Sequence, residues 1–276
     1  MSWYAIEVQP DPERRDAVAA WLVSRTGQAV EERADGTLVS FALDLPGAES
    51  LERELARAHG PVSTLRRELP EVDWSTAWRA GLGVRRVGRF AVVPTWIEHP
   101  FAPGELVITL DPEMAFGSGE HGSTRGALLL LERWLRPGDR VLDLGSGSGI
   151  LSIAAARLGA GRVTGIEMDV EAIPVSLENA GRNGVADLVR FVEGDAAVMT
   201  PLLRPADLVV SNILRLVNQA LLPVIHEALP AGGRAIFSGM ETAEAEAFRP
   251  PLVAAGFVPV DEVVDEGWWS VAGERT

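Results

Sequence analysis

Residues 140–149 read R-V-L-D-L-G-S-G-S-G, and this stretch decides the fold of the chain. A short apolar run leads to three glycines at alternate positions, Gly145, Gly147 and Gly149, and an apolar, alanine-rich segment follows from Ile150. This is the order strand, glycine turn, helix. Such a turn lets the main chain approach a ligand where a Cβ atom would collide, and it aims the N–H groups of the helix start above the sheet. We therefore predict a ligand-binding turn here rather than a loop without a ligand.

Strands and helices alternate downstream of this turn. Strands are predicted at residues 162–166, 189–192, 208–210 and 234–238, helices at 171–183, 219–229 and 242–255, and a closing pair of strands at 257–264 and 268–272. Such alternation predicts a mostly parallel, doubly wound α/β sheet. We expect the closing pair to add an antiparallel hairpin at the edge of that sheet.

A second loop leads into a helix upstream of the turn. Strands are predicted at residues 90–96 and 105–110, and residues 114–124 form a glycine-rich polar loop before a helix at 125–135. Thr124 stands where a helix N-cap is expected, because its hydroxyl can accept from a free backbone N–H group.

The first 68 residues have a different pattern. Their apolar residues predict strand, helix, strand, strand, helix, strand, with Asp35-Gly36 as a hairpin signal. This order is typical of a small ferredoxin-like α+β domain. Residues 1–68 hold no cluster of catalytic residue types, so we expect a recognition domain there, a linker at 69–84 and a catalytic domain at 85–276.

Polar side chains follow the predicted strands at four points, Asp143, Glu167, Asp195 and Asn212. Ligands of open parallel sheets bind beyond the carboxyl ends of the strands, so these side chains should meet at one edge. Glu167 follows the last glycine of the turn by 18 residues, where an acid is expected to accept the hydroxyls of a ribose. Asp169 is the competing candidate for that role.

The remaining polar candidates each have two interpretations. Asp195 can accept from an adenine amino group or stabilise a turn. Asn212 carries a donor and an acceptor, so it can orient an incoming amine or cap a turn. His121, one of 4 histidines, fits a structural hydrogen bond as well as a base. No group of His, Asp and Glu has the spacing of metal ligands, which predicts no metal site.

Composition excludes several classes of function. All 25 basic residues are arginine, which rules out a Schiff-base lysine and a Walker-type phosphate loop. The formal net charge of −14 disfavours binding to duplex nucleic acid and favours a basic partner. The sequence has no apolar run that could span a bilayer and no signal-peptide pattern at its start, so we expect a cytoplasmic protein.

Residues 114–124, M-A-F-G-S-G-E-H-G-S-T, resemble the M-A-F-G-T-G-x-H-x-T-T motif of the ribosomal protein L11 methyltransferases, the PrmA family. Residues 211–214, S-N-I-L, and residues 266–268, E-G-W, resemble later motifs of that family, and residues 73–78 resemble its linker. The resemblance covers residues 72–276, whereas the N-terminal domain matches in length and element order. Departures are serines in place of two motif threonines, Glu167 in place of aspartate, and no basic residue or proline just after the linker helix.

The resemblance implies a class I methyltransferase fold, which is Rossmann-like. It also implies methyl transfer from S-adenosylmethionine (SAM) to lysine side chains and the N-terminal amine of ribosomal protein L11, a basic partner docked by the N-terminal domain. We expect the cofactor to contact Phe116, Thr124, Gly145, Gly147, Glu167, Asp195 and Asn212. Asn212 is also the expected catalytic residue, with Phe116 bordering the point of methyl transfer, and the enzyme is expected to be a monomer.

Four other functions stay open on the residues alone. A lysine methyltransferase with a different protein substrate would share these motifs. A nucleic-acid amino-methyltransferase would carry prolines where Ile213 and Leu214 follow Asn212. A nicotinamide dehydrogenase is disfavoured because the third glycine comes one residue too early. A SAM-binding scaffold without catalysis is the fourth.

Overall fold

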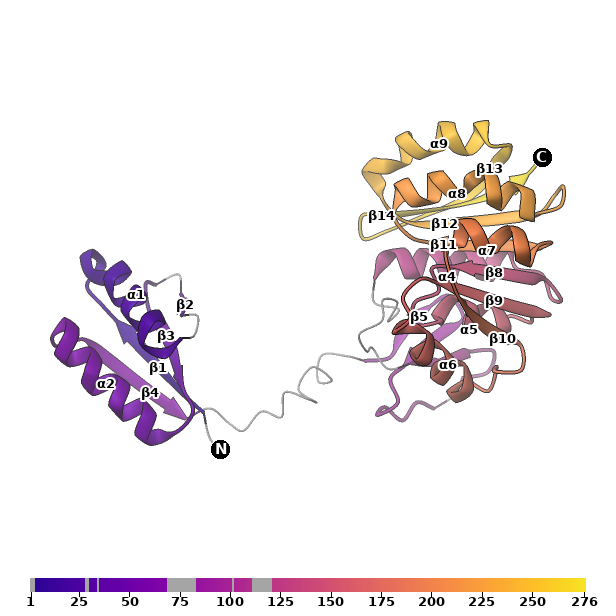
Figure 1. Cartoon of the computed structure of the whole chain (residues 1–276). Coiled ribbons are helices and arrows are strands. Elements are labelled where there is room, and N and C mark those ends of the chain that lie inside the picture. Colours follow the sequence, from indigo (N-terminus) through magenta and orange to yellow (C-terminus); the bar gives the residue numbers. More distant parts are fainter. Residues whose placement is uncertain (1–2, 28–29, 34, 69–82, 101, 111–120) are drawn as a thin grey trace. The chain divides into compact units, whose positions relative to one another are not determined.

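The computed structural model describes residues 3–27, 30–33, 35–68, 83–100, 102–110 and 121–276. The chain divides into two compact units, Met1–Gly81 and Leu82–Thr276 (Figure 1). Phe116 and nearly all of the predicted linker lie outside the described residues. Within the described part, no helix is long and apolar enough to cross a membrane.

The N-terminal unit is a four-stranded antiparallel sheet packed against two helices. Its elements are β1 (Tyr4–Gln9), η1 (Pro12–Arg14), α1 (Arg15–Thr26), β2 (Glu31–Glu32), β3 (Leu38–Ala42), α2 (Leu45–His59) and β4 (Ser63–Glu68). The strand order β2-β3-β1-β4 confirms the predicted ferredoxin-like arrangement. Helix α2 begins at Leu45, where the Asp44 carboxylate accepts from the Gly47 N–H at 2.7 Å and caps the helix.

The C-terminal unit combines a seven-stranded sheet with a separate three-stranded sheet. Its described elements are β5 (Arg85–Val87), β6 (Phe90–Val93), β7 (Leu106–Thr109), α4 (Gly122–Trp134), β8 (Arg140–Leu144), α5 (Ile150–Arg157), β9 (Arg162–Glu167), α6 (Ala172–Arg182), β10 (Val189–Glu193), α7 (Ala196–Leu203), β11 (Leu208–Asn212), α8 (Arg215–Ala228), β12 (Arg234–Glu241), η3 (Thr242–Glu244), α9 (Ala245–Ala254), β13 (Phe257–Asp265) and β14 (Trp268–Arg275). Among these described elements, strand β5 and helix α7 were not predicted from the sequence.

The large sheet has the order β10-β9-β8-β11-β12-β14-β13. Strands β10, β9, β8, β11 and β12 run parallel, and β14 runs antiparallel to both of its neighbours. The predicted doubly wound sheet with an antiparallel closing hairpin is therefore confirmed. The chain moves outward from β8 to β10 and then returns to β11 on the other side of β8, so a topological switch point lies between β8 and β11.

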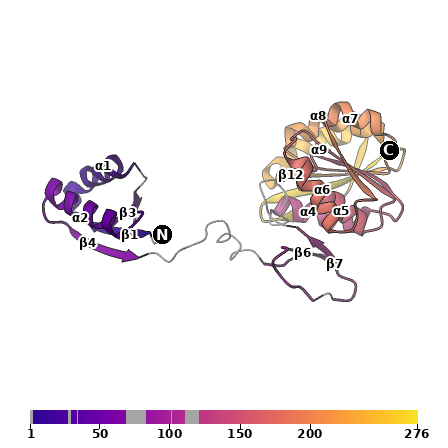
Figure 2. The ribbon, with the colours of Figure 1, turned by 60° about the horizontal axis from the view of Figure 1, so that its bottom comes forward.

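Helices cover both faces of this sheet (Figure 2). Consecutive residues of a strand point to opposite faces. Val141 accordingly packs with α4 and α5 on one face, while Leu142 packs with α8 and α9 on the other. Because both faces are buried, β8 has to be apolar almost throughout. Its one carboxylate, Asp143, is therefore an exception that needs an explanation.

Candidate functional site

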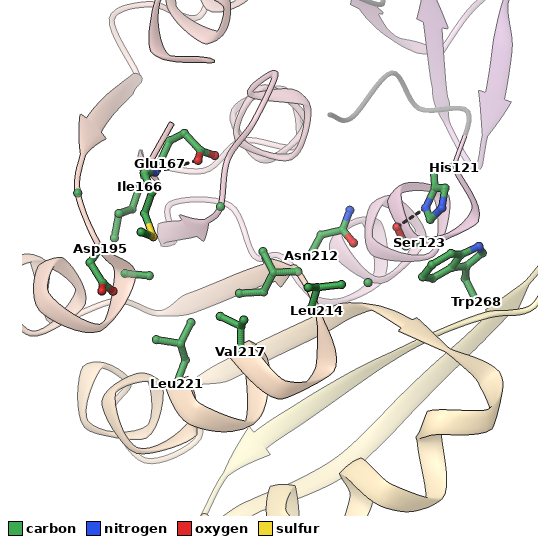
Figure 3. Close-up of a pocket in the computed structure, with 16 residues that line it drawn as sticks. His121, Ser123, Ile166, Glu167, Asp195, Asn212, Leu214, Val217, Leu221 and Trp268 are labelled. Carbon is green, nitrogen blue, oxygen red and sulfur yellow. Dashed lines mark hydrogen bonds between the residues drawn. The ribbon is translucent and has the colours of Figure 1, made fainter. Parts of the chain in front are cut away.

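A pocket of about 480 Å³ opens at the carboxyl ends of β8, β9 and β11, beside the topological switch point (Figure 3). It brings together four of the residues predicted from the sequence, Gly145, Glu167, Asp195 and Asn212. The expectation that the strand-end side chains meet at one edge of the sheet is met for Glu167, Asp195 and Asn212, whereas Asp143 does not line the pocket. The first turn of α4, the start of α8 and the beginning of β14 supply the other walls.

The glycine turn adopts the backbone conformation that its sequence predicts. Gly145, Gly147 and Gly149 have φ angles of 71°, 50° and 82°, values that residues with a Cβ atom seldom adopt. A Cβ atom on Gly145 would also lie 2.6 Å from Ile213 Cγ2. Gly147 does not line the pocket. Its backbone N–H donates to Glu167 Oε2 at 2.8 Å, so it holds a pocket residue instead.

Glu167, the last residue of β9, is fixed by backbone donors. Besides the bond from Gly147, its Oε1 accepts from the backbone N–H groups of Met168 at 2.8 Å and Asp169 at 3.0 Å. The rival candidate Asp169 turns its own carboxylate to the Glu171 N–H, at 2.9 Å, and does not line the pocket. Of the two acids, Glu167 is therefore the one placed to meet a ligand.

Asp195 stabilises the local backbone and also lies at the pocket. It is the N-cap of α7, where its carboxylate accepts from the Ala197 N–H at 2.7 Å. It also lines the pocket. The cap bond occupies Oδ1, which leaves Oδ2 as the oxygen that can accept from a ligand.

Asn212 ends β11 on the pocket wall. Its Nδ2 donates to Thr124 Oγ1 at 3.3 Å, while its Oδ1 is buried and has no hydrogen-bond partner among the described residues. A buried acceptor without a partner is unfavourable unless a ligand satisfies it. The amide oxygen of Asn212 thus marks a position for a donor that enters the pocket.

The prediction that Thr124 caps a helix is wrong. Helix α4 begins at Gly122 with His121 at the N-cap, so Thr124 lies inside the first turn, behind Asn212. The closing hairpin packs against the start of this helix. A Cβ atom on Gly122 would lie 2.5 Å from the Asp265 carbonyl oxygen and 2.9 Å from Trp268 Cδ1. Only glycine lets the helix start pack this closely against the hairpin.

His121, Ser123 and Trp268 also line the pocket, and none of them was predicted as a cofactor or catalytic residue (Figure 3). His121 Nδ1 lies 2.7 Å from Ser123 Oγ, and the His121 ring lies against that of Trp268 with centroids 4.1 Å apart. Burial, together with the charge of Arg125, lowers the pKa of His121 below its usual value. The ring is therefore neutral at neutral pH, and its hydrogen bond supports the structural interpretation of this histidine.

One wall of the pocket is apolar. It consists of Ile213, Leu214, Val217 and Leu221, which lie on the loop after β11 and on α8. Leu214 is 72% exposed and Val217 is 45% exposed. A ligand or substrate that covers these side chains removes them from water, which favours binding.

Asp143 is fully buried in β8, next to the glycine turn. Its Oδ2 accepts from Ser152 Oγ at 2.7 Å, and its Oδ1 has no partner among the described residues. Burial raises the pKa of Asp143 to about 7, the bond from Ser152 opposes the rise, and the charge of Glu167 adds to it. The carboxyl group is thus poised between its two protonation states near neutral pH.

We expect Asp143→Asn to stabilise the C-terminal unit more at pH 8 than at pH 5. The folded protein keeps a proton on Asp143 between its ordinary pKa of 3.8 and about 7, whereas the unfolded chain loses that proton near pH 4. The stability contributed by this group is present below pH 4 and is lost as the pH rises through 7. In denaturant unfolding, the variant's gain over wild type should grow by more than about 1 kcal/mol between these pH values. A gain that does not change with pH would contradict the raised pKa.

In the described residues, no group of three or more His, Asp or Glu side chains is arranged to hold a metal ion.

Comparisons with known proteins identify the family. The family model described as ribosomal protein L11 methyltransferase (PrmA) matches residues 42–276. The ribosomal protein L11 methyltransferase of Pelotomaculum thermopropionicum is 42% identical, over 88% of this chain and 79% of the relative. That of Chloroflexus aurantiacus is 35% identical, over 99% of this chain and 98% of the relative. The crystal structure of ribosomal protein L11 methylase from Lactobacillus delbrueckii subsp. bulgaricus matches with a TM-score of 0.65 and 30% identity, covering 71% of this chain and 100% of that one.

The family model spans most of the chain, the relatives match over most of their own length, and the fold is the one expected of class I methyltransferases. The chain belongs to the ribosomal protein L11 methyltransferase (PrmA) family, and it is a SAM-dependent protein methyltransferase.

Proposed function

We propose that this enzyme methylates ribosomal protein L11 on lysine side chains and on its N-terminal amine. The relatives are ribosomal protein L11 methyltransferases, which supports L11 as the substrate. The main support for an amine substrate is the side chain of Asn212. Asn212 lines the pocket, and its buried Oδ1 has no hydrogen-bond partner among the described residues. A neutral amine supplies the N–H group that such an oxygen accepts.

The residues of the pocket fit SAM. Its volume of about 480 Å³ is in the range of small-molecule and cofactor sites. Gly145 lines the pocket with main chain that carries no side chain, and Glu167 offers a carboxylate that three backbone N–H groups hold in place. Polar groups that converge on a mostly apolar cavity are typical of a cofactor site.

Each predicted contact then has a distinct role. When bound, SAM supplies a methyl group on a sulfonium centre, which a neutral amine can attack. Glu167 accepts hydrogen bonds from the ribose hydroxyls. Asp195 accepts a hydrogen bond from the adenine amino group through Oδ2, because Oδ1 already accepts from the Ala197 N–H. Gly145 gives the cofactor access to the main chain, and Gly147 fixes Glu167. Phe116 lies outside the described residues, and we still expect it to border the methyl group.

Asn212 and Thr124 act on the incoming amine. Thr124 Oγ1 accepts from Asn212 Nδ2 at 3.3 Å, which turns the amide so that Oδ1 is left for the amine. Holding two reactants in the correct geometry supplies a large part of the rate acceleration in such displacements. The apolar wall at Leu214 and Val217 removes water from the amine, and this lowers the pKa of a lysine and favours its neutral, reactive form.

Incubation with purified L11 and labelled SAM, followed by mass spectrometry of the product, tests this assignment. We expect methyl groups on lysine side chains and on the N-terminal amine of L11. A parallel reaction with total ribosomal proteins reports selectivity. Labelling of another protein in preference to L11 would transfer the assignment to a different protein substrate.

Glu167→Ala should weaken SAM binding about tenfold or more, because a carboxylate that accepts hydroxyl hydrogen bonds contributes about 1.5–3 kcal/mol. Isothermal titration calorimetry measures the change. Glu193→Ala is the matched control, since Glu193 ends the neighbouring strand opposite Glu167 but does not line the pocket. Equal SAM affinity in the wild type and in Glu167→Ala would exclude the ribose contact.

We further propose that residues 1–68 recognise the substrate protein and that residues 69–84 link them to the catalytic residues 85–276. The ferredoxin-like unit has its own core, formed by residues such as Ile6, Leu22 and Leu55. The net charge of −14 suits a basic protein partner and opposes direct binding to nucleic acid. We also propose that the enzyme acts in the cytoplasm and that it is a monomer.

A further inference from the structure

Asn218 is a buried polar residue near the start of α8 that does not line the pocket. Its side chain bonds to the main chain just after β11, the strand that ends in Asn212, and to the main chain of the neighbouring strand β12. The Nδ2 group donates to the carbonyl oxygens of Ile213 at 3.0 Å and Ser238 at 2.8 Å. Its Oδ1 accepts from Ser211 Oγ at 2.7 Å.

These partners fix which way the amide faces. The two carbonyl oxygens can only accept, so the NH₂ group must point toward them and the oxygen toward the Ser211 hydroxyl. Ser211 precedes Asn212 and Ile213 follows it. The side chain of Asn218, which is 0% exposed, therefore bonds to the side chain of the residue before Asn212 and to the main chain of the residue after it.

The same network reaches the hydroxyl that orients Asn212. Ser238 lies opposite Asn212 in the register of β11 and β12. Ser238 Oγ donates to the carbonyl oxygen of Ser123 at 2.7 Å. The next residue, Thr124, accepts from Asn212 Nδ2. The contacts thus run from Asn218 to Ser238 of β12, from Ser238 to the first turn of α4, and from that turn to the side chain of Asn212.

Gly239 completes the support on the β12 side. It has a φ angle of 81°, and a Cβ atom there would lie 2.4 Å from the Ile213 carbonyl oxygen. The Ile213 peptide thus rests directly on the main chain of Gly239. The Ile213 carbonyl packs against Gly239, and it accepts its hydrogen bond from the side chain of Asn218.

We propose that Asn218 is a positioning residue for methyl transfer, which sets the place of Asn212 without touching substrate or cofactor. This inference rests on the proposed role of Asn212 in holding the amine. Loss of the two carbonyl bonds lets the peptide after Asn212 shift. A shift of about 1 Å at a reacting centre is enough to lower a rate strongly.

Asn218→Asp and Asn218→Leu test the proposal. Aspartate keeps the shape of the side chain but removes its donors, and leucine removes every polar bond. The matched controls are Asn183→Asp and Asn183→Leu. Asn183 is 3% exposed and, like Asn218, makes three hydrogen bonds with its side chain: it accepts from Thr109 N and donates to the carbonyls of Thr109 and Asn179. It does not line the pocket.

For each full-length variant, kcat and KM with intact L11, the SAM dissociation constant and the melting temperature are measured. Both Asn218 variants should lose about tenfold in kcat with SAM affinity and KM within about twofold of wild type. The Asn183 variants should keep kcat within about twofold at a comparable loss of melting temperature. Asn218→Asp should also recover turnover, relative to wild type, as the pH falls, because a protonated carboxyl group can donate again.

Two results would overturn the proposal. One is a kcat of the Asn218 variants that falls no further than that of the Asn183 controls. The other is a parallel loss of SAM affinity, which would make Asn218 a support of the cofactor site. Asn212→Ala is measured alongside. If that variant stays active, the proposed function of Asn212 fails, whereas an impaired Asn212→Ala with unimpaired Asn218 variants refutes only the positioning role.

Discussion

Asn212→Ala is expected to lower turnover by about a hundredfold while SAM affinity changes by less than about threefold, because the substitution removes an interaction made with the amine at the moment of transfer. The reason lies in the hydrogen bonds of the amide. Its Nδ2 is held by Thr124 Oγ1, and its buried Oδ1 is left without a partner among the described residues. Steady-state kinetics with L11, together with calorimetry for SAM, separate the two effects.

Asn183→Ala is the control for this measurement, since it removes a buried asparagine amide that does not line the pocket. Its turnover should stay near that of wild type. If Asn212→Ala loses turnover and SAM affinity in parallel, Asn212 is a cofactor contact only. An Asn212→Ala enzyme with full activity would remove the residue from the catalytic machinery altogether.

The local pattern around the glycine turn was enough to predict the centre of the fold. An apolar strand, glycines at positions 145, 147 and 149 and an apolar helix specify a conformation that few other residues can adopt. The strand ends could be predicted for the same reason, because parallel strands bring their carboxyl ends to one edge. Glu167, Asp195 and Asn212 therefore reached the pocket wall as expected.

Helices whose apolar residues face solvent were harder to predict. Helix α8 begins at Arg215, whereas the apolar spacing predicted a start at residue 219. Leu216 is 67% exposed and Val217 is 45% exposed. The first turn therefore lacks the polar outer face by which an amphipathic helix is recognised in a sequence. Helix α7 was missed for a similar reason, since Val198 and Leu202 point outward and Pro201 lies inside the helix.

The remaining part of the site depends on contacts between distant segments. Trp268 meets His121 across 147 positions of the sequence, because β14 is brought beside the start of α4. The Arg125 guanidinium secures this contact through Glu266 Oε2 at 2.7 Å and through the Asp265 carboxylate. No periodicity within either segment indicates that they meet. The absence of a Cβ atom at Gly122 allows the hairpin to pack there, and that requirement appears only in three dimensions.

A chain that begins at Arg85 is expected to bind SAM with wild-type affinity and to lose about a hundredfold or more in kcat/KM with intact L11, the loss expected when a docking interface is removed. The pocket residues and the buried core around β8 all belong to the C-terminal unit. The N-terminal unit has a separate core of its own. Removing it should therefore leave the pocket intact.

The comparison that tests docking uses two substrates. A saturating short lysine peptide needs only the pocket, so the shortened chain should methylate it about as fast as the full-length enzyme does. Intact L11 needs the docking surface as well, so its methylation alone should collapse. Addition of the separate N-terminal unit should inhibit the full-length enzyme by competing for L11. Undiminished methylation of intact L11 by the shortened chain would place substrate recognition on the C-terminal unit, where the exposed apolar side chains of Leu214 and Val217 already border the pocket.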